Sequence, residues 1–292
     1  MKIAIAAAAG NVGSRIAKQL QNTPDLELVL LGNNADALKS LEITSATIVE
    51  TDLSDISQVN NATKNVNALF WMVPPVVHTT SLKSWYEKLI NAGVNAVQKN
   101  NIERVVLLSA LGAGSKENLG TVTYSGFMEQ SFDKIDTNVL ALRPGYFLEN
   151  LLLQKSTILN EGHFSFTYNG DHSIPFISSD DIGDAASKYL FDDKWKGKWK
   201  LNLMGPENLT PNDIALRMSN VLNKEITYKK LSISEAKENL KANNINTIVI
   251  EELIELFKAL GDPYGVYNTP RTHEALTVTT LEDFINKKLL MI

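Results

Sequence analysis

Short apolar runs alternate with amphipathic stretches through the first 150 residues of the chain. Each run is only a few residues long, consists mainly of Ala, Val, Ile and Leu, and several end at Gly, Asn or Pro. Runs of this length between turn residues are typical of buried strands. The predicted strands span residues 3–8, 28–31, 46–49, 68–73, 104–108 and 139–142.

Helical periodicity fills the gaps between these runs. Val12, Ile16 and Leu20 recur every four residues and mark one buried helix face, and a second such face recurs within residues 82–93. Near-continuous apolar strands separated by helices predict a parallel sheet that is covered on both faces. Because connections between such strands are right-handed, we expect a doubly wound parallel sheet, the Rossmann type of α/β fold. Ligands of this fold bind beyond the carboxyl ends of the strands.

The last third of the chain carries helix-start signals instead. Capping patterns, with Ser or Thr followed three residues later by an acid, occur at residues 210–213, 232–235 and 279–282. They predict a smaller, mainly helical C-terminal lobe against the carboxyl edge of the sheet. We expect the dinucleotide-binding domain over residues 1–204 and the lobe over 205–292, with contacts to 151–176.

Composition narrows the function classes. The 292 residues carry a net charge of −5 and no Lys/Arg-rich run, which argues against direct nucleic-acid or membrane-surface binding. The absence of cysteine excludes disulfides and thiolate chemistry, and the four histidines lack ligand spacing, so no metal site is expected. We interpret the apolar N-terminus as a first strand that runs into a turn and a helix, and we expect a cytoplasmic protein.

The turn between the first strand and the first helix carries the first candidate chemistry. A pyrophosphate needs close backbone approach and free amide hydrogens at a helix N-terminus. Gly10 would allow that approach, and Gly13 would allow the helix to pack closely on the strand. The usual fingerprint has a glycine earlier in the turn, where this chain has Ala7. The predicted cofactor contacts here are Ala7, Ala9, Gly10, Asn11, Val12 and Gly13.

The end of the second strand is where adenosine ribose selectivity is usually set. An acid there binds the ribose hydroxyls, and an arginine favours a 2′-phosphate. This chain has Gly32 and Asn33 at that point, which are neither, although Asn33 has an amide for a hydroxyl or a phosphate. The sequence therefore leaves the choice between NAD and NADP open.

The ends of the next three strands supply further candidates. Asp52 and Leu53 are placed to meet the adenine, although Asp52 would equally serve as a cap for the following helix. The remaining predicted contacts are Met72, Val73 and Pro74 near the cofactor ribose and Ser109 near the nicotinamide.

Motifs spread over the whole chain, in order, resemble the NmrA-like family, which are atypical relatives of the short-chain dehydrogenases. The resemblance implies a Rossmann domain that binds NAD(P)H, a small C-terminal lobe and a cleft between them. Some members of that family are quinone or azo-dye reductases, and others are sensors that bind dinucleotide without turnover. The segments that carry the resemblance are residues 9–13, 105–112, 142–150, 180–183, 203–207 and 279–284.

Departures from the family pattern bear on catalysis. Reductases of the family often carry Lys or His four residues before a helical glutamate; Glu129 is that glutamate and Ser125 stands in the Lys position. The position of the short-chain dehydrogenase tyrosine holds Thr121. Ser125 would hydrogen-bond the nicotinamide ribose but supplies no positive field. The catalytic candidates that remain are Ser109, Tyr124 and Ser125, and a core or cleft-lining role would account equally for Tyr124.

By family position, Tyr146, Phe147 and Asn150 are expected at the substrate cleft. Aromatic residues there would wall a flat apolar substrate, but packing between the lobes would select the same residue types. We expect a reductase that transfers hydride from NAD(P)H to a small apolar acceptor such as a quinone. The alternatives are a dinucleotide-sensing regulator, which would bind a protein partner or form a homodimer, and, ranked last, a sugar-nucleotide epimerase.

Overall fold

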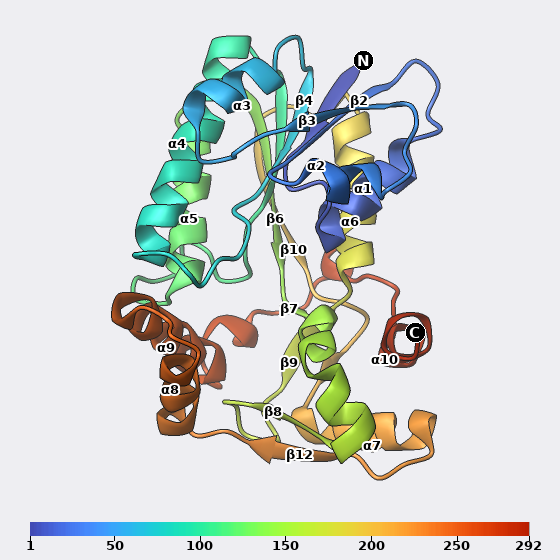
Figure 1. Ribbon diagram of the computed structural model, residues 1–292, viewed down its shortest axis with the longest axis vertical. Helices are drawn as coiled ribbons and strands as arrows, with labels where there is room; N and C mark the ends of the chain where they lie inside the picture. Colours follow the sequence, from blue (N-terminus) through green and yellow to red (C-terminus); the bar gives the residue numbers. More distant parts are fainter. Residues whose placement is uncertain (292) are drawn as a thin grey trace.

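A seven-stranded parallel sheet with helices on both faces dominates the computed structural model, which describes residues 1–291 (Figure 1). The strand order is β10-β6-β5-β4-β1-β2-β3, so the chain starts in the middle, winds out to one edge and then returns to the other side of β1. The reversal between β1 and β4 is the switch point of a doubly wound fold, the class that the sequence predicted. The strands are β1 (Lys2–Ile5), β2 (Glu27–Gly32), β3 (Ala46–Glu50), β4 (Ala68–Trp71), β5 (Arg104–Leu108), β6 (Asn138–Pro144) and β10 (Lys198–Leu203).

Three strand predictions need correction. The fourth strand ends at Trp71, not at residue 73. The first strand ends at Ile5, not at residue 8, because Ala7 adopts a left-handed conformation with φ 51°. Strand β10, which pairs only with β6 at the sheet edge, was not predicted from the sequence. Its first residues are exposed and two of them are lysines, so no apolar run marks it.

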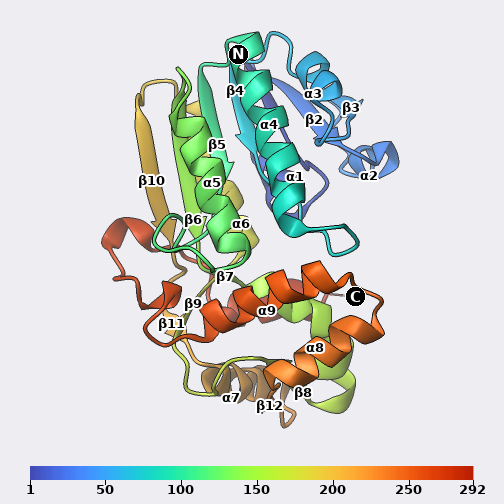
Figure 2. The same ribbon diagram turned by 90° about the vertical axis from the view of Figure 1, so that its left-hand side faces the viewer.

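Helices cover both faces of the sheet because alternate strand residues point to opposite sides. In β4, Phe70 packs with α1 and α6, and Leu69 and Trp71 pack with α3, α4 and α5. Figure 2 shows α4 and α5 side by side on one face of the sheet. A short helix, α2, lies beyond the end of β2. The helices are α1 (Asn11–Leu20), α2 (Ala35–Lys39), α3 (Ile56–Ala62), α4 (Leu82–Asn100), α5 (Thr121–Asp133) and α6 (Ser179–Phe191).

A second, smaller lobe lies beyond the carboxyl ends of the strands (Figure 1). Its helices are α7 (Pro211–Leu222), α8 (Ile233–Ala242), α9 (Thr247–Gly261) and α10 (Leu281–Phe284). Two small sheets accompany them, one of β7 (Tyr146–Phe147), β9 (Ile174–Ile177) and β11 (Asn208–Leu209), the other of β8 (His163–Phe166) and β12 (Thr227–Lys230). Short 3₁₀ or π turns span Leu148–Gln154, Thr157–Glu161, Val266–Asn268, His273–Ala275 and Ile285–Leu289.

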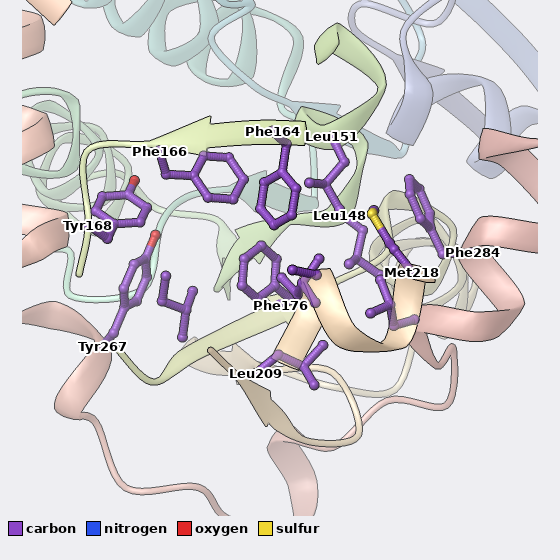
Figure 3. Packing of buried hydrophobic residues seen from close by; sticks show 14 of the residues in the cluster. Leu148, Leu151, Phe164, Phe166, Tyr168, Phe176, Leu209, Met218, Tyr267 and Phe284 are labelled. Atoms are coloured by element: carbon purple, nitrogen blue, oxygen red, sulfur yellow. The ribbon is translucent and has the colours of Figure 1, made fainter. Parts of the chain in front are cut away.

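The core of this lobe is rich in aromatic side chains. Phe164 and Phe166 of β8 and Phe176 of β9 share one buried cluster with Tyr267 and Phe284 from the C-terminal part of the chain (Figure 3). The core of the smaller lobe therefore combines segments that precede α6 in the sequence with segments that follow β10. Between them, α6 and β10 themselves belong to the large sheet and its helical layer. Within residues 1–291, no helix has both the length and the hydrophobicity to cross a membrane.

Candidate functional site: the turn after the first strand

The turn between β1 and α1 is tight. The N–H of Gly10 donates to the carbonyl oxygen of Ala7 at 2.9 Å, and the left-handed Ala7 reverses the chain direction. A Cβ atom on Gly13 would lie 2.5 Å from the Ala7 oxygen and 2.8 Å from the Ala8 Cα. Glycine at position 13 is therefore what allows α1 to begin directly against the end of β1.

The N-terminus of α1 offers free donors. Its first intrahelical bond runs from the N–H of Ser14 to the Gly10 oxygen at 2.8 Å, which leaves the N–H groups of Asn11, Val12 and Gly13 without an intrahelical partner. Gly10 has no side chain to cap them, and no acid lies in the first turn. Every other helix labelled α, except α5, begins with a side chain that accepts a backbone N–H. An N-terminus of this kind suits a phosphate group.

This helix end opens on a cavity of 380 Å³ at the switch point of the sheet. Leu53, Pro74 and Trp85 give it an apolar wall, and the Trp85 Nε1 donates to the Pro74 oxygen at 2.9 Å. Its size, its apolar wall and the adjoining free amides fit the adenosine diphosphate part of a dinucleotide. The lining residues are Ala7, Ala9, Gly10, Gly32, Asn33, Asn34, Ala37, Thr51, Asp52, Leu53, Pro74, Pro75, Val76 and Trp85.

The cavity brings together many of the predicted cofactor residues, but not all. Val12 is buried beneath the turn, so only its backbone faces a ligand there. Val73 is likewise buried, and Met72 packs in the core between the sheet, α1 and α6. Ser109 and Ser125 are also absent from the lining of this cavity.

Asp52 lines the cavity and does not cap α3. Its Oδ1 accepts hydrogen bonds from the N–H and the hydroxyl of Ser54, whereas α3 is capped by Asp55, which accepts the N–H of Gln58 at 2.9 Å. Sequence reasoning missed Asn34, whose Oδ1 caps α2. Trp85 was also not predicted. It lies on α4 beside the expected core face, and no motif in the neighbouring sequence marks it as a ligand contact.

A buried ion pair lies where the nicotinamide was expected. Glu129 of α5 is 2 % exposed and holds Arg143 of β6 through two contacts, 2.8 Å from Nε and 2.5 Å from Nη2. The hydroxyl of Ser109 donates to the same carboxylate at 2.5 Å. The ion pair and Ser109 thus tie the ends of β5 and β6 to α5. In the described part of the chain, no three His, Asp or Glu side chains gather as metal ligands.

The two catalytic candidates on α5 are engaged elsewhere. The Ser125 hydroxyl donates to the carbonyl oxygen of Thr121 one turn earlier, at 3.0 Å. The Tyr124 hydroxyl donates to Glu252 of α9, also at 3.0 Å. Burial, and then the Glu252 carboxylate, raise the pKa of Tyr124 well above its ordinary value of 10.0. A tyrosine that donates protons in short-chain dehydrogenases needs a lowered pKa, so this environment acts in the opposite direction.

Tyr146 belongs to the aromatic core of the smaller lobe. Its ring lies edge-on to those of Phe166, Tyr168, Phe176 and Tyr267, with centroids 5.3 to 6.5 Å away. Burial raises the pKa of Tyr146 to about 12. Phe147 packs instead against the core under α1 and α6, and Asn150 is half-buried. Packing between and within the lobes, the alternative considered above, accounts for both aromatic rings.

The fold and the first turn together define a dinucleotide-binding α/β protein. A family model described as NAD(P)H-binding matches residues 7–190, and the chain belongs to this family. An NmrA-like family domain-containing oxidoreductase of Penicillium ochrochloron is 22% identical over 273 residues, which cover 85% of this chain and 76% of that protein. The NmrA-like resemblance and the NAD(P)H cofactor class expected from the sequence are thereby confirmed.

Two further similarities come from an enzyme sequence and a solved structure. Festuclavine dehydrogenase of Aspergillus fumigatus is 33% identical over 156 residues, which cover 51% of each chain, so the match spans about half the length of that relative. The NADPH-dependent quinone oxidoreductase of Escherichia coli, in a crystal structure complexed with NADPH, superposes with a TM-score of 0.78. That match covers 98% of this chain and 99% of the other at 20% identity, which shows a shared fold.

Proposed function

We propose that this protein is an NAD(P)H-dependent reductase that transfers hydride to a small apolar acceptor such as a quinone. The observation that carries the proposal is the uncapped N-terminus of α1, opening on a cavity at the switch point. The similarity to a quinone oxidoreductase over nearly the whole chain supports the acceptor class. The cytoplasmic location expected from the sequence belongs to the same proposal.

The chain's own residues would mainly position the cofactor, which supplies the hydride when bound. The free N–H groups of residues 11–13 would hold the pyrophosphate, and Leu53 and Trp85 would flank the adenosine. No Tyr–Lys pair stands on α5 to deliver a proton, since Thr121 and Ser125 occupy those positions. A quinone suits such a site, because its reduced oxygens take protons from water.

The test is a turnover assay with the purified chain, NADH or NADPH, and a panel of quinones. We expect loss of absorbance at the nicotinamide band with at least one cofactor. The variant Gly10→Ala is compared in the same assay. It should bind the dinucleotide more weakly, because its methyl group would intrude on the pyrophosphate position. Dinucleotide binding without any turnover across the panel would overturn the reductase proposal.

A dinucleotide-responsive regulator is the second candidate. It is favoured by the engagement of Ser125 and Tyr124 in structural hydrogen bonds. This function predicts calorimetric binding of a dinucleotide without turnover, together with a protein partner or a homodimer whose assembly depends on the dinucleotide. Sedimentation that shows the same monomer with and without dinucleotide, and co-purification of no partner, would argue against it. An epimerase ranks below both candidates, because it normally needs the missing Tyr–Lys pair.

A further inference from the structure

The charges around the adenosine end of the cavity are mainly negative. Among the described residues that line the cavity, Asp52 is the one charged side chain, and no Lys or Arg is among them. Glu50, exposed at the end of β3, lies directly beside Gly32 in the strand register. Both carboxylates lie at or just after the end of β3, and Asp52 is the one that lines the cavity. A negatively charged ligand group at the end of β2 would therefore meet a carboxylate and no cation in this lining.

The short helix after β2 carries one lysine, which is paired with an acid of the same helix. Asp36 lies in its first turn, next to the cavity-lining Ala37, and the ammonium group of Lys39 is 3.2 Å from the Asp36 carboxylate. Arg15 on α1 is held by Asp184 of α6 through two hydrogen bonds of 2.6 and 2.8 Å. Lys39 and Arg15 are thus each paired with a carboxylate, and neither lines the cavity.

We propose that this protein selects NADH over NADPH, and that Gly32 and Asn33 determine the selection. The inference rests on the proposed dinucleotide binding at the first turn. A 2′-phosphate carries about two negative charges and needs a cation, usually a guanidinium at the end of the second strand. Free ribose hydroxyls need only a donor and an acceptor, and the exposed amide of Asn33 supplies both. The site therefore differs in cofactor choice from the NADPH-bound quinone oxidoreductase whose fold it shares.

Gly32 offers a direct way to reverse the selection. A Cβ atom there would lie 3.5 Å from the Leu38 Cδ2, an ordinary contact, and the φ of Gly32 is not in the left-handed region. A larger side chain at position 32 is therefore compatible with the backbone. Gly32→Arg would place a guanidinium beside the ribose, and Gly32→Gln is a neutral control that also adds a long polar side chain.

Calorimetric titration of NADH and NADPH into the full chain tests this proposal without relying on activity. We expect NADH to bind the unmodified protein about tenfold more tightly than NADPH. Gly32→Arg should raise the NADPH affinity by about tenfold and narrow or invert the preference, whereas Gly32→Gln should leave the NADPH affinity low.

The outcomes separate this inference from the function on which it rests. Equal or tighter NADPH binding by the unmodified protein would overturn the preference and leave the dinucleotide site intact. An NADPH gain that Gly32→Gln reproduces would show that charge at position 32 is not the determinant. Failure of both dinucleotides to bind would overturn the proposed function and the preference together.

Discussion

Replacement of Gly13 by alanine should destabilise the protein, although alanine is the better helix former. The added Cβ would meet the Ala7 oxygen at 2.5 Å and the Ala8 Cα at 2.8 Å. Both are backbone atoms, so no side-chain rotation relieves the overlap and α1 must move away from β1. Overpacking of a close contact costs about 3 kcal/mol at the upper end of its usual range. Alanine in place of glycine in a helix returns about 1 kcal/mol, which leaves a net loss of about 2 kcal/mol.

Gly10→Ala is the matched control for this experiment. Its Cβ would lie 3.2 Å from the same Ala7 oxygen, and the backbone at φ −76° and ψ 169° accepts any residue. We expect it to lower the free energy of unfolding by less than about 1 kcal/mol. Its methyl group would face the cavity, so dinucleotide affinity should fall while the fold is kept. Urea denaturation followed by circular dichroism measures stability, and calorimetry measures binding. The reasoning fails if Gly13→Ala is as stable as the unmodified protein, or if Gly10→Ala loses as much stability.

Three further predictions concern contacts outside the first turn. Glu252 accepts hydrogen bonds from the N-terminus of α4, including two backbone N–H groups at 2.6 and 2.9 Å, so Glu252→Gln should cost about 1 kcal/mol in urea denaturation. An unchanged midpoint would contradict this role. Arg143→Met leaves the buried Glu129 charge uncompensated and should cost about 3 kcal/mol; adding Glu129→Gln should recover part of that loss, and a double-mutant cycle checks whether it does. The hydrogen bond from Arg217 lowers the pKa of Glu282 below its ordinary value of 4.5, so this pair stabilises the fold above pH 4.5 and the stabilisation is lost as the pH falls through the lowered pKa. Thermal melts over the acid range should therefore show a shallower decline for Arg217→Gln, and parallel curves would refute the assignment.

The elements that the sequence predicted well are those whose whole surface is buried. The apolar runs of β2, β5 and β6 meet neighbours on both faces and both edges, so their composition alone identifies them. The edge strand β10 has one paired neighbour and an exposed start, so its pattern is indistinct. The left-handed conformation of Ala7 could not be predicted, because alanine rarely adopts it whereas glycine does so readily.

The sequence could predict those site residues that lie at the carboxyl ends of the strands. Gly32 ends β2, and Gly10 and Asp52 lie in the turns after β1 and β3. Because ligands of this fold bind beyond the carboxyl ends of the strands, all three were expected at one edge of the sheet. Trp85 depends on the rotation of α4 and on the path of the chain after β4, which are set by tertiary packing. The choice between Asp52 and Asp55 as the cap of α3 likewise depends on a turn geometry that both residues fit in sequence.

The contacts of α5 give a physical reason to place the chemistry in the cofactor. The hydroxyls of Ser125 and Tyr124 are bound to Thr121 and Glu252, and the higher pKa of Tyr124 makes its proton harder to release. The same Glu252 carboxylate caps α4, so the contact that holds the Tyr124 hydroxyl also fastens α9 of the smaller lobe to α4 and α5 (Figure 2). To free Tyr124 as an acid, the protein would have to give up an attachment between its two lobes. An acceptor that takes its protons from water avoids that conflict, and this is the physical reason for proposing a quinone over a substrate that needs a positioned acid.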